Sequence, residues 1–133
     1  RPYNIYGPRM GKDHVIPDFK KKLTLLKGKN FKIQGSGNEI RSFCHIDDFI
    51  EAFDVLLKKG KHLNVYNIGT SERIKIKDLA YKMSKISKKR IVIKKTQLSK
   101  GSTKIRVPDI SKIKKLGFKP KLNLDKGLRT ILS

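Results

Sequence analysis

The residue best placed to do chemistry is Arg41, which directly follows a glycine-rich turn and begins a short apolar run. Gly35 and Gly37 permit backbone conformations that other residues avoid, so this stretch predicts a tight turn. Arginine carries a planar, permanently charged guanidinium group that can bind a phosphate through two parallel hydrogen bonds. The stretch therefore predicts an anion-binding wall, although a solvated surface arginine after a turn is the simpler alternative.

The elements that must position this turn follow from the apolar periodicity on either side of it. Strands are expected at 2–6, 31–34, 41–46, 64–68, 74–76 and 91–93, helices at 17–27, 48–59, 77–87, 110–116 and 124–132, and a polar loop at 96–104. Asp48 and Glu51 have the spacing of a capping box, and Gly60 ends that helix, which is expected to bury Phe53 and Leu56. No repeat or linker divides the chain, so residues 1–133 are expected to form one α/β domain.

Five short motifs flank the stretch from Gly35 to Asp48 in a fixed order. They are Arg1-Pro2-Tyr3-Asn4-Ile5-Tyr6-Gly7-Pro8, His14-Val15-Ile16-Pro17, Val65-Tyr66-Asn67-Ile68-Gly69-Thr70, Arg106-Val107-Pro108-Asp109 and Leu116-Gly117-Phe118-Lys119-Pro120. Together they resemble the C-terminal half of an extended short-chain dehydrogenase/reductase, in the NAD-dependent nucleotide-sugar epimerase/dehydratase family. The resemblance covers nearly the whole chain.

This resemblance implies both a fold and an activity. The chain is expected to be the small mixed α/β substrate-binding lobe of a Rossmann-type enzyme, with residues 1–8 as the end of the Rossmann sheet. The lobe would hold a nucleotide diphosphate sugar for epimerisation, dehydration or decarboxylation through a transient keto-sugar. The cofactor, NAD or NADP, would be bound mainly by an N-terminal half that precedes Arg1. The complete enzyme is expected to be a homodimer, and this piece alone to be inactive.

The resemblance also assigns candidate substrate-binding residues. Arg41 and Arg106 match family arginines that clamp the nucleotide diphosphate or its ribose. Asn4 matches an asparagine that contacts the sugar or diphosphate, with bonding to its own turn as the alternative. His14 and Val15 match a pair that meets the diphosphate, although His14 also fits an ordinary helix start.

The same resemblance gives weaker assignments to Asn67, Pro2 and Tyr3. Asn67 matches an occasional substrate contact, with bracing of its own turn as the alternative. The backbone of Pro2 and Tyr3 is expected near the nicotinamide. Asp109 is expected to cap the helix that follows it rather than to touch a ligand.

Two other patterns imitate functional motifs. Gly35-Ser36-Gly37 resembles the start of a dinucleotide fingerprint, but that fingerprint opens a helix, whereas a strand is expected here. Tyr81 and Lys85 have the spacing of the family's catalytic pair, yet they lie off the apolar stripe of their helix and after the motifs that this pair precedes. We interpret them as a solvent-facing pair, so the sequence offers no catalytic residues.

Charge leaves a second functional class open. The formal net charge is +22, from 33 Lys/Arg against 11 Asp/Glu. Such a balance is compatible with a stand-alone module that binds nucleic acid or another polyanion without catalysis. Most of the basic residues are lysines on the polar faces of periodic segments, with few aromatic residues between them, and this favours solvated surfaces. The family motifs favour the enzyme.

The cysteine content and the length of the apolar runs indicate the cellular environment in which the protein works. Cys44 is the single cysteine, which excludes an internal disulfide and a thiolate zinc cluster, and its apolar neighbours predict a buried, inert thiol. No run of apolar residues is long enough to span a membrane. A cytoplasmic location is therefore expected.

Overall fold

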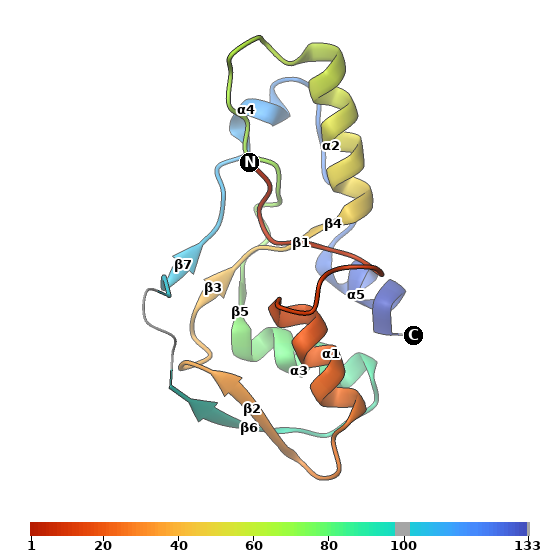
Figure 1. The fold of residues 1–133 in the computed structure, drawn as a ribbon, viewed down its shortest axis with the longest axis vertical. Coiled ribbons are helices and arrows are strands. Elements are labelled where there is room, and N and C mark those ends of the chain that lie inside the picture. Colours follow the sequence, from red (N-terminus) through yellow and green to blue (C-terminus); the bar gives the residue numbers. More distant parts are fainter. Residues whose placement is uncertain (98–101, 133) are drawn as a thin grey trace.

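The computed structural model describes residues 1–97 and 102–132, which form an elongated molecule of mixed helices and short strands (Figure 1). The helices are α1 (Val15–Thr24), α2 (Ile46–Lys59), α3 (Ile76–Ile86), α4 (Ser111–Lys114) and α5 (Leu124–Leu132). The strands are β1 (Ile5–Tyr6), β2 (Asn30–Gln34), β3 (Ile40–Arg41), β4 (Cys44–His45), β5 (Ile74–Lys75), β6 (Val92–Thr96) and β7 (Ile105–Arg106). Helices α2 and α4 lie at one end and β2 and β6 at the other.

Three small sheets connect distant parts of the sequence. Strands β1 and β4 pair in parallel, as do β2 and β6, and the third sheet has the order β5-β3-β7. In that sheet β3 is antiparallel to β5 and parallel to β7. Because β7 follows β3 by more than sixty residues, this pairing brings the segment around 105 beside the glycine-rich turn.

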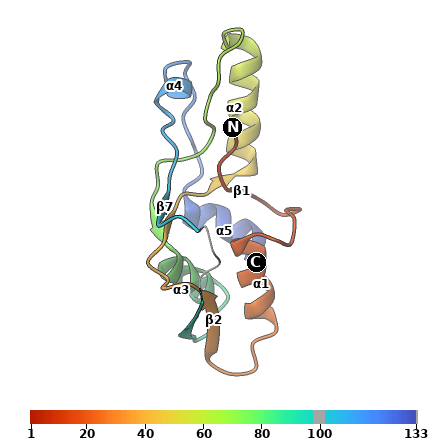
Figure 2. The same cartoon turned by 60° about the vertical axis from the view of Figure 1, so that its left-hand side comes forward.

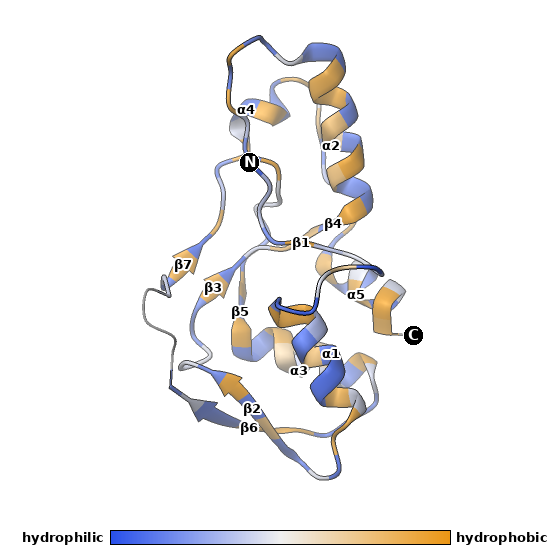
Figure 3. Cartoon of the chain, in the orientation of Figure 1, coloured by the Kyte–Doolittle hydropathy of each residue, from blue (hydrophilic) through white to orange (hydrophobic). Residues whose placement is uncertain are grey.

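The core is divided between the two ends of the molecule. The larger cluster packs α1, α3 and α5 against β2 and includes Phe19, Phe31, Leu79 and Leu128. A smaller cluster joins α2 and α4 and includes Phe118. Helix α5 lies between the two ends, as the turned view shows (Figure 2). Apolar and polar residues alternate along each of the longer helices (Figure 3).

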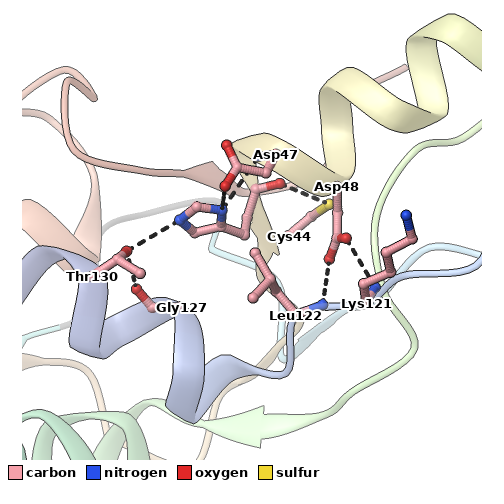
Figure 4. A network of polar contacts seen from close by, with 8 residues as sticks. Cys44, Asp47, Asp48, Lys121, Leu122, Gly127 and Thr130 are labelled. Atoms are coloured by element: carbon pink, nitrogen blue, oxygen red, sulfur yellow. Dashed lines mark hydrogen bonds and ion pairs between the residues drawn. The ribbon is translucent and has the colours of Figure 1, made fainter.

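A polar network joins the start of α2 to the segment before α5 (Figure 4). The side chain of His45 caps α2 by accepting from the Asp47 backbone N–H at 3.3 Å. The buried Asp48 carboxylate accepts from the backbone N–H groups of Lys121 and Leu122 at 2.9 and 3.1 Å. The predicted capping box of Asp48 and Glu51 is therefore wrong, because the Asp48 carboxylate binds another segment instead of its own helix.

Several other expectations need correction. Phe53 is 51% exposed, together with Ile50 and Leu57 on the same side of α2, so the expected burial of Phe53 is wrong for this chain. The expected strand at 64–68 is reduced to one bridge between Pro2 and Ile68. The expected strand at 41–46 is divided into β3 and β4. Helix α1 begins before Pro17 and ends at Thr24, so the glycine at position 28 does not terminate it.

The expected strand at 2–6 is shortened to β1, because Asn4 has a positive φ of 43° that an extended strand does not accommodate. The other expected helices and the strands near 31–34, 74–76 and 91–93 are confirmed within one or two residues, except that β6 extends to Thr96 and α4 is shorter than expected. Part of the expected loop at 96–104 lies outside the described residues. The prediction of a mixed α/β architecture is confirmed.

Candidate functional site

The glycine-rich turn has the predicted conformation. Gly35 and Gly37 have φ values of 78° and 80°, in the left-handed region that favours glycine. A Cβ atom on Gly37 would lie 2.8 Å from Ile33 Cδ1, so close packing excludes a side chain there as well. The turn then leads directly into β3 and Arg41, not into a helix. This geometry agrees with the prediction that the turn is not a dinucleotide fingerprint, because such a fingerprint leads into a helix.

Glu39, which the sequence analysis passed over, holds the turn together. Its buried carboxylate accepts from the Ser36 and Gly37 backbone N–H groups at 3.1 and 2.9 Å and from the Ser36 hydroxyl at 2.9 Å. Desolvation by burial raises the pKa of Glu39, but these hydrogen bonds outweigh it and lower the pKa below its ordinary value. An ionised Glu39 therefore fixes the turn two residues before Arg41.

The Arg41 guanidinium group is half-buried and directed across β3 and the start of β7. It donates to the Ile40 carbonyl at 2.8 Å and the Lys104 carbonyl at 3.5 Å through Nη1, and to the Ser102 hydroxyl at 3.4 Å through Nη2. Desolvation by burial, and then the neighbouring positive charge of Arg106, lower the pKa of Arg41, while Glu39 opposes this. The hydrogen bonds that orient the group are therefore all to neutral oxygen atoms, and the Glu39 carboxylate only partly offsets the repulsion from Arg106.

Arg106 is the register partner of Arg41 on the parallel strands β3 and β7. The two residues lie far apart in the sequence, and only the pairing of β3 with β7 places them side by side. Two neighbouring cations repel each other, and an anion bound near both would relieve that repulsion. This is the electrostatic arrangement of an anion site.

A cavity of about 470 Å³ opens beside Arg41. Its lining comes from the N-terminal segment, α1, β2 and the Arg41 region, and it consists of Asn4, Lys12, Asp13, His14, Val15, Asp18, Phe19, Lys22, Gln34, Arg41, Phe43, Ile76 and Ser102. Four of the predicted substrate-binding residues thus converge on one space: Asn4, His14, Val15 and Arg41. Arg106 flanks this group through its pairing with Arg41.

Asn4 and His14 are held in different ways. Asn4 has a positive φ of 43°, and its side-chain amide donates to the Ser42 carbonyl at 2.8 Å. The bond crosses to another segment, so Asn4 is not bonded to its own turn. His14 is the N-cap residue of α1, but its imidazole makes no capping hydrogen bond. The His14 side chain lines the cavity instead.

Besides Arg106, three candidates lie outside the cavity lining: Asn67, Pro2 and Tyr3. The Asn67 amide donates to the Asp109 carbonyl at 3.1 Å, which agrees with the bracing alternative. Pro2 forms a bridge with Ile68, and the Tyr3 backbone N–H donates to the Ile68 carbonyl at 2.9 Å. Asp109 accepts from the Ser111 backbone N–H at 2.8 Å, at the start of α4 as expected.

The cavity contains polar residues that sequence reasoning missed. Lys12, Gln34 and Ser102 line it together with the Asp18–Lys22 ion pair, which has an N–O distance of 2.6 Å. The one available signal was the position of Gln34 directly before the glycine-rich turn. Lys12 and Ser102 lie in segments without periodicity, and only the tertiary fold brings them here.

Tyr81 and Lys85, which have the spacing of the family's catalytic pair, lie outside the cavity lining. Tyr81 is 48% exposed, and Lys85 is exposed on the same helix, as expected for a solvent-facing pair. Cys44 is fully buried, and burial raises the pKa of its thiol to about 12, with a smaller contribution from Asp48. Among residues 1–97 and 102–132, no group of three or more His, Cys, Asp and Glu side chains could hold a metal ion. The helices of that same part include none long and apolar enough to cross a membrane.

Comparison with known proteins gives consistent matches. Residues 1–69 match the NAD dependent epimerase/dehydratase family. The chain is 44% identical over 87 residues to dTDP-D-glucose 4,6-dehydratase of Dictyostelium discoideum, covering 65% of this chain and 20% of that protein. It is 34% identical over 131 residues to UDP-glucuronic acid decarboxylase 6 of Arabidopsis thaliana, covering 96% of this chain and 37% of that protein.

A solved structure extends the likeness to the fold. UDP-glucuronic acid 4-epimerase from Bacillus cereus, in complex with UDP-glucuronic acid and NAD, superposes with a TM-score of 0.88 and 30% identity, over 99% of this chain and 42% of that one. The chain thus spans a fifth to about two fifths of the length of these proteins. The sequence match over residues 1–69 and the agreement in fold show that the chain belongs to the NAD-dependent epimerase/dehydratase family.

Proposed function

We propose that this chain is the nucleotide-sugar-binding part of an NAD-dependent epimerase, dehydratase or decarboxylase. The observation that carries the proposal is the convergence of Asn4, His14 and Arg41, from three separate segments, on one cavity of about 470 Å³. A volume of this size is typical of small-molecule sites. The named relatives act on UDP- and dTDP-sugars, which carry an anionic diphosphate.

Arg41 is the residue we assign to the diphosphate. Its backbone is fixed by the Glu39-bound turn, and its guanidinium group is oriented by neutral oxygen acceptors, so the remaining N–H groups can bind phosphate oxygens. Arg106 beside it would bind the second phosphate or the adjoining ribose. Lys12 and His14 would contribute further donors on the facing wall.

Asn4 suits the sugar side of the ligand. An amide can both donate and accept, as sugar hydroxyls require. One amide N–H is used by the Ser42 carbonyl, so the side chain is held in place while its oxygen stays available for a hydroxyl donor. The chain would thus contribute positioning: binding energy from the nucleotide end orients the sugar for reaction.

The cofactor of this family does not fit the residues of this chain. The glycine pair at 35–37 leads into β3, whereas a dinucleotide site needs a glycine-rich turn that opens a helix. We therefore propose that NAD or NADP is bound mainly by residues outside positions 1–133, with Pro2 and Tyr3 near the nicotinamide. The oxidation and acid–base steps are not assigned to residues of this chain.

Titration of the full-length protein with UDP, dTDP, GDP, CDP and the matching nucleosides tests the proposal. Because most of the predicted contacts are to the diphosphate, we expect at least one diphosphate to bind roughly 100-fold more tightly than its nucleoside. Comparing the four bases would then identify the nucleotide. Equal binding of diphosphate and nucleoside would contradict the assignment of the cavity.

A further inference from the structure

A second hollow lies between the end of α1 and β2. It has a volume of about 690 Å³, and Asp18 and Lys22 border both this hollow and the substrate cavity. Apart from the neutral Asn30, its remaining polar lining is cationic: Lys21, Lys27, Lys29 and Lys32. The one carboxylate of the lining, Asp18, is already bound to Lys22 at 2.6 Å. The hollow therefore has an excess of positive charge that its own residues do not compensate.

The pairing of β2 with β6 extends this charge across the surface. Lys32 is the register partner of Lys94, and the Val92 backbone N–H donates to the Lys29 carbonyl at 2.6 Å. We call five exposed cations of this end the basic face: Lys27, Lys29, Lys32, Arg90 and Lys94. Lys95 is not among them, because it is the register partner of the buried Ile33 and so lies on the other side of the sheet. Within the described part of the chain, no carboxylate forms an ion pair with any residue of the basic face.

The sequence shows how unusual this concentration is. Residues 19–38 contain six Lys/Arg and residues 79–108 contain ten, and neither segment contains an Asp or Glu. Each segment alone resembles a solvated lysine-rich stretch. The β2–β6 sheet places them side by side, at the opposite end of the molecule from α2 (Figure 1). The fold thus combines two acid-free segments into one surface.

We propose that the basic face binds the phosphate backbone of double-stranded nucleic acid. Its cations are lysines with a single arginine, and the one aromatic ring between them, Phe31, is 1% exposed. Single-stranded nucleic acid is held largely by stacking of bases on exposed rings, and the basic face offers none. The hollow is concave, so it fits the convex ridge of a duplex backbone, whereas a lipid bilayer is flat on this scale.

The charge predicts a measurable salt dependence. If each of the five cations neutralises one phosphate, the logarithm of the binding constant should fall with the logarithm of the salt concentration with a slope of about −4.5. A diphosphate in the substrate cavity releases far fewer counterions. Salt dependence therefore distinguishes the two ligands, and the failure of either proposal would leave the other in place.

The test is fluorescence anisotropy of a labelled 20-base-pair duplex of arbitrary sequence with the full-length protein, between about 50 and 300 mM salt. The variant K27Q/K29Q/K32Q/K94Q should bind about 100-fold more weakly, with a slope of about −1. None of these four residues lines the substrate cavity. An unchanged far-UV circular dichroism spectrum and melting temperature will show that the variant is folded.

The matched control is K59Q/K61Q/K114Q/K119Q, which removes the same net charge from exposed lysines outside the basic face. It should change duplex binding less than about threefold. Equal loss in both variants would mean that net charge alone attracts the duplex, and it would overturn the proposal. So would binding of phosphatidylserine vesicles, or of single strands, with no binding of the duplex.

Discussion

Arg41 and Arg106 are direct register partners on the parallel strands β3 and β7, although the sequence separates them widely. Their guanidinium groups have no carboxylate ion pair in the described residues, and the charge of Arg106 helps to lower the pKa of Arg41. Two like charges fixed beside a cavity are unfavourable for stability on their own. A bound diphosphate would supply the opposite charge, and this is the role that we propose for the pair.

Glu39 should stabilise the glycine-rich turn only while it is ionised. Its folded-state pKa is lowered, so its contribution is present above the ordinary carboxyl pKa of about 4.3 and is lost as the pH falls below that value. Glu39→Gln should therefore lower the free energy of unfolding clearly at pH 7 and much less at about pH 3.5. Urea unfolding at the two pH values measures this difference.

The control for that measurement is Glu51→Gln. Glu51 forms a surface ion pair with Lys121 at 2.7 Å, and such pairs contribute little to stability. Its effect should be small at both pH values. An equal effect of Glu39→Gln at both pH values would show that the carboxylate charge does not hold the turn.

The Cys44 thiol should be unreactive in the folded protein. It is fully buried, and its pKa is raised to about 12, so almost no thiolate exists at pH 8. Ellman's reagent should label Cys44 only after unfolding in urea. The variant Thr103→Cys, at an exposed position, is the positive control and should react at once. Labelling of native Cys44 at the rate of the Thr103→Cys thiol would contradict the structure.

Leu128 should be among the most important residues for stability. It is fully buried in the larger cluster, so Leu128→Ala should cost about 2–5 kcal/mol. Leu63 is 91% exposed, and the same substitution there should cost less than about 0.5 kcal/mol. Denaturant unfolding of the two variants compares the loss of the same side chain at a buried position and at an exposed one. Similar losses would show that the larger cluster is misplaced.

Local patterns in the sequence were sufficient for most elements. The apolar spacing of Phe19 and Leu23 predicted α1, that of Leu79 and Met83 predicted α3, and both pairs are buried. The same logic failed for Phe53, because a periodic apolar face shows which side is apolar but not whether anything in the chain covers it. It failed for Asp48 because a carboxylate near a helix start can bind a distant segment, and spacing does not reveal this.

The candidate site was predictable to a similar degree. The glycine-rich turn pointed to Arg41 directly, and the resemblance supplied Asn4, His14 and Val15. Lys12 was missed because it lies in a segment without periodicity, and Gln34 was missed although it directly precedes the glycine-rich turn. The adjacency of Arg41 and Arg106 depends on the pairing of two two-residue strands, which are too short to show a periodic pattern.

The arginine pair carries the central claim, and titration of the full-length protein with UDP and dTDP tests it most directly. Because hydrogen bonds to charged groups contribute about 1.5–3 kcal/mol each, Arg41→Ala and Arg106→Ala should each weaken binding of the preferred diphosphate roughly 10- to 150-fold. Arg41→Lys should restore it only in part, since an ammonium group keeps the charge but loses the planar fork.

Arg73→Ala, at an exposed arginine outside the cavity lining, should leave the dissociation constant nearly unchanged. This pattern, with two arginines that matter and one that does not, is the result we predict. If Arg41→Ala and Arg106→Ala bind the diphosphate as tightly as the unmodified protein, the proposed anion site is wrong.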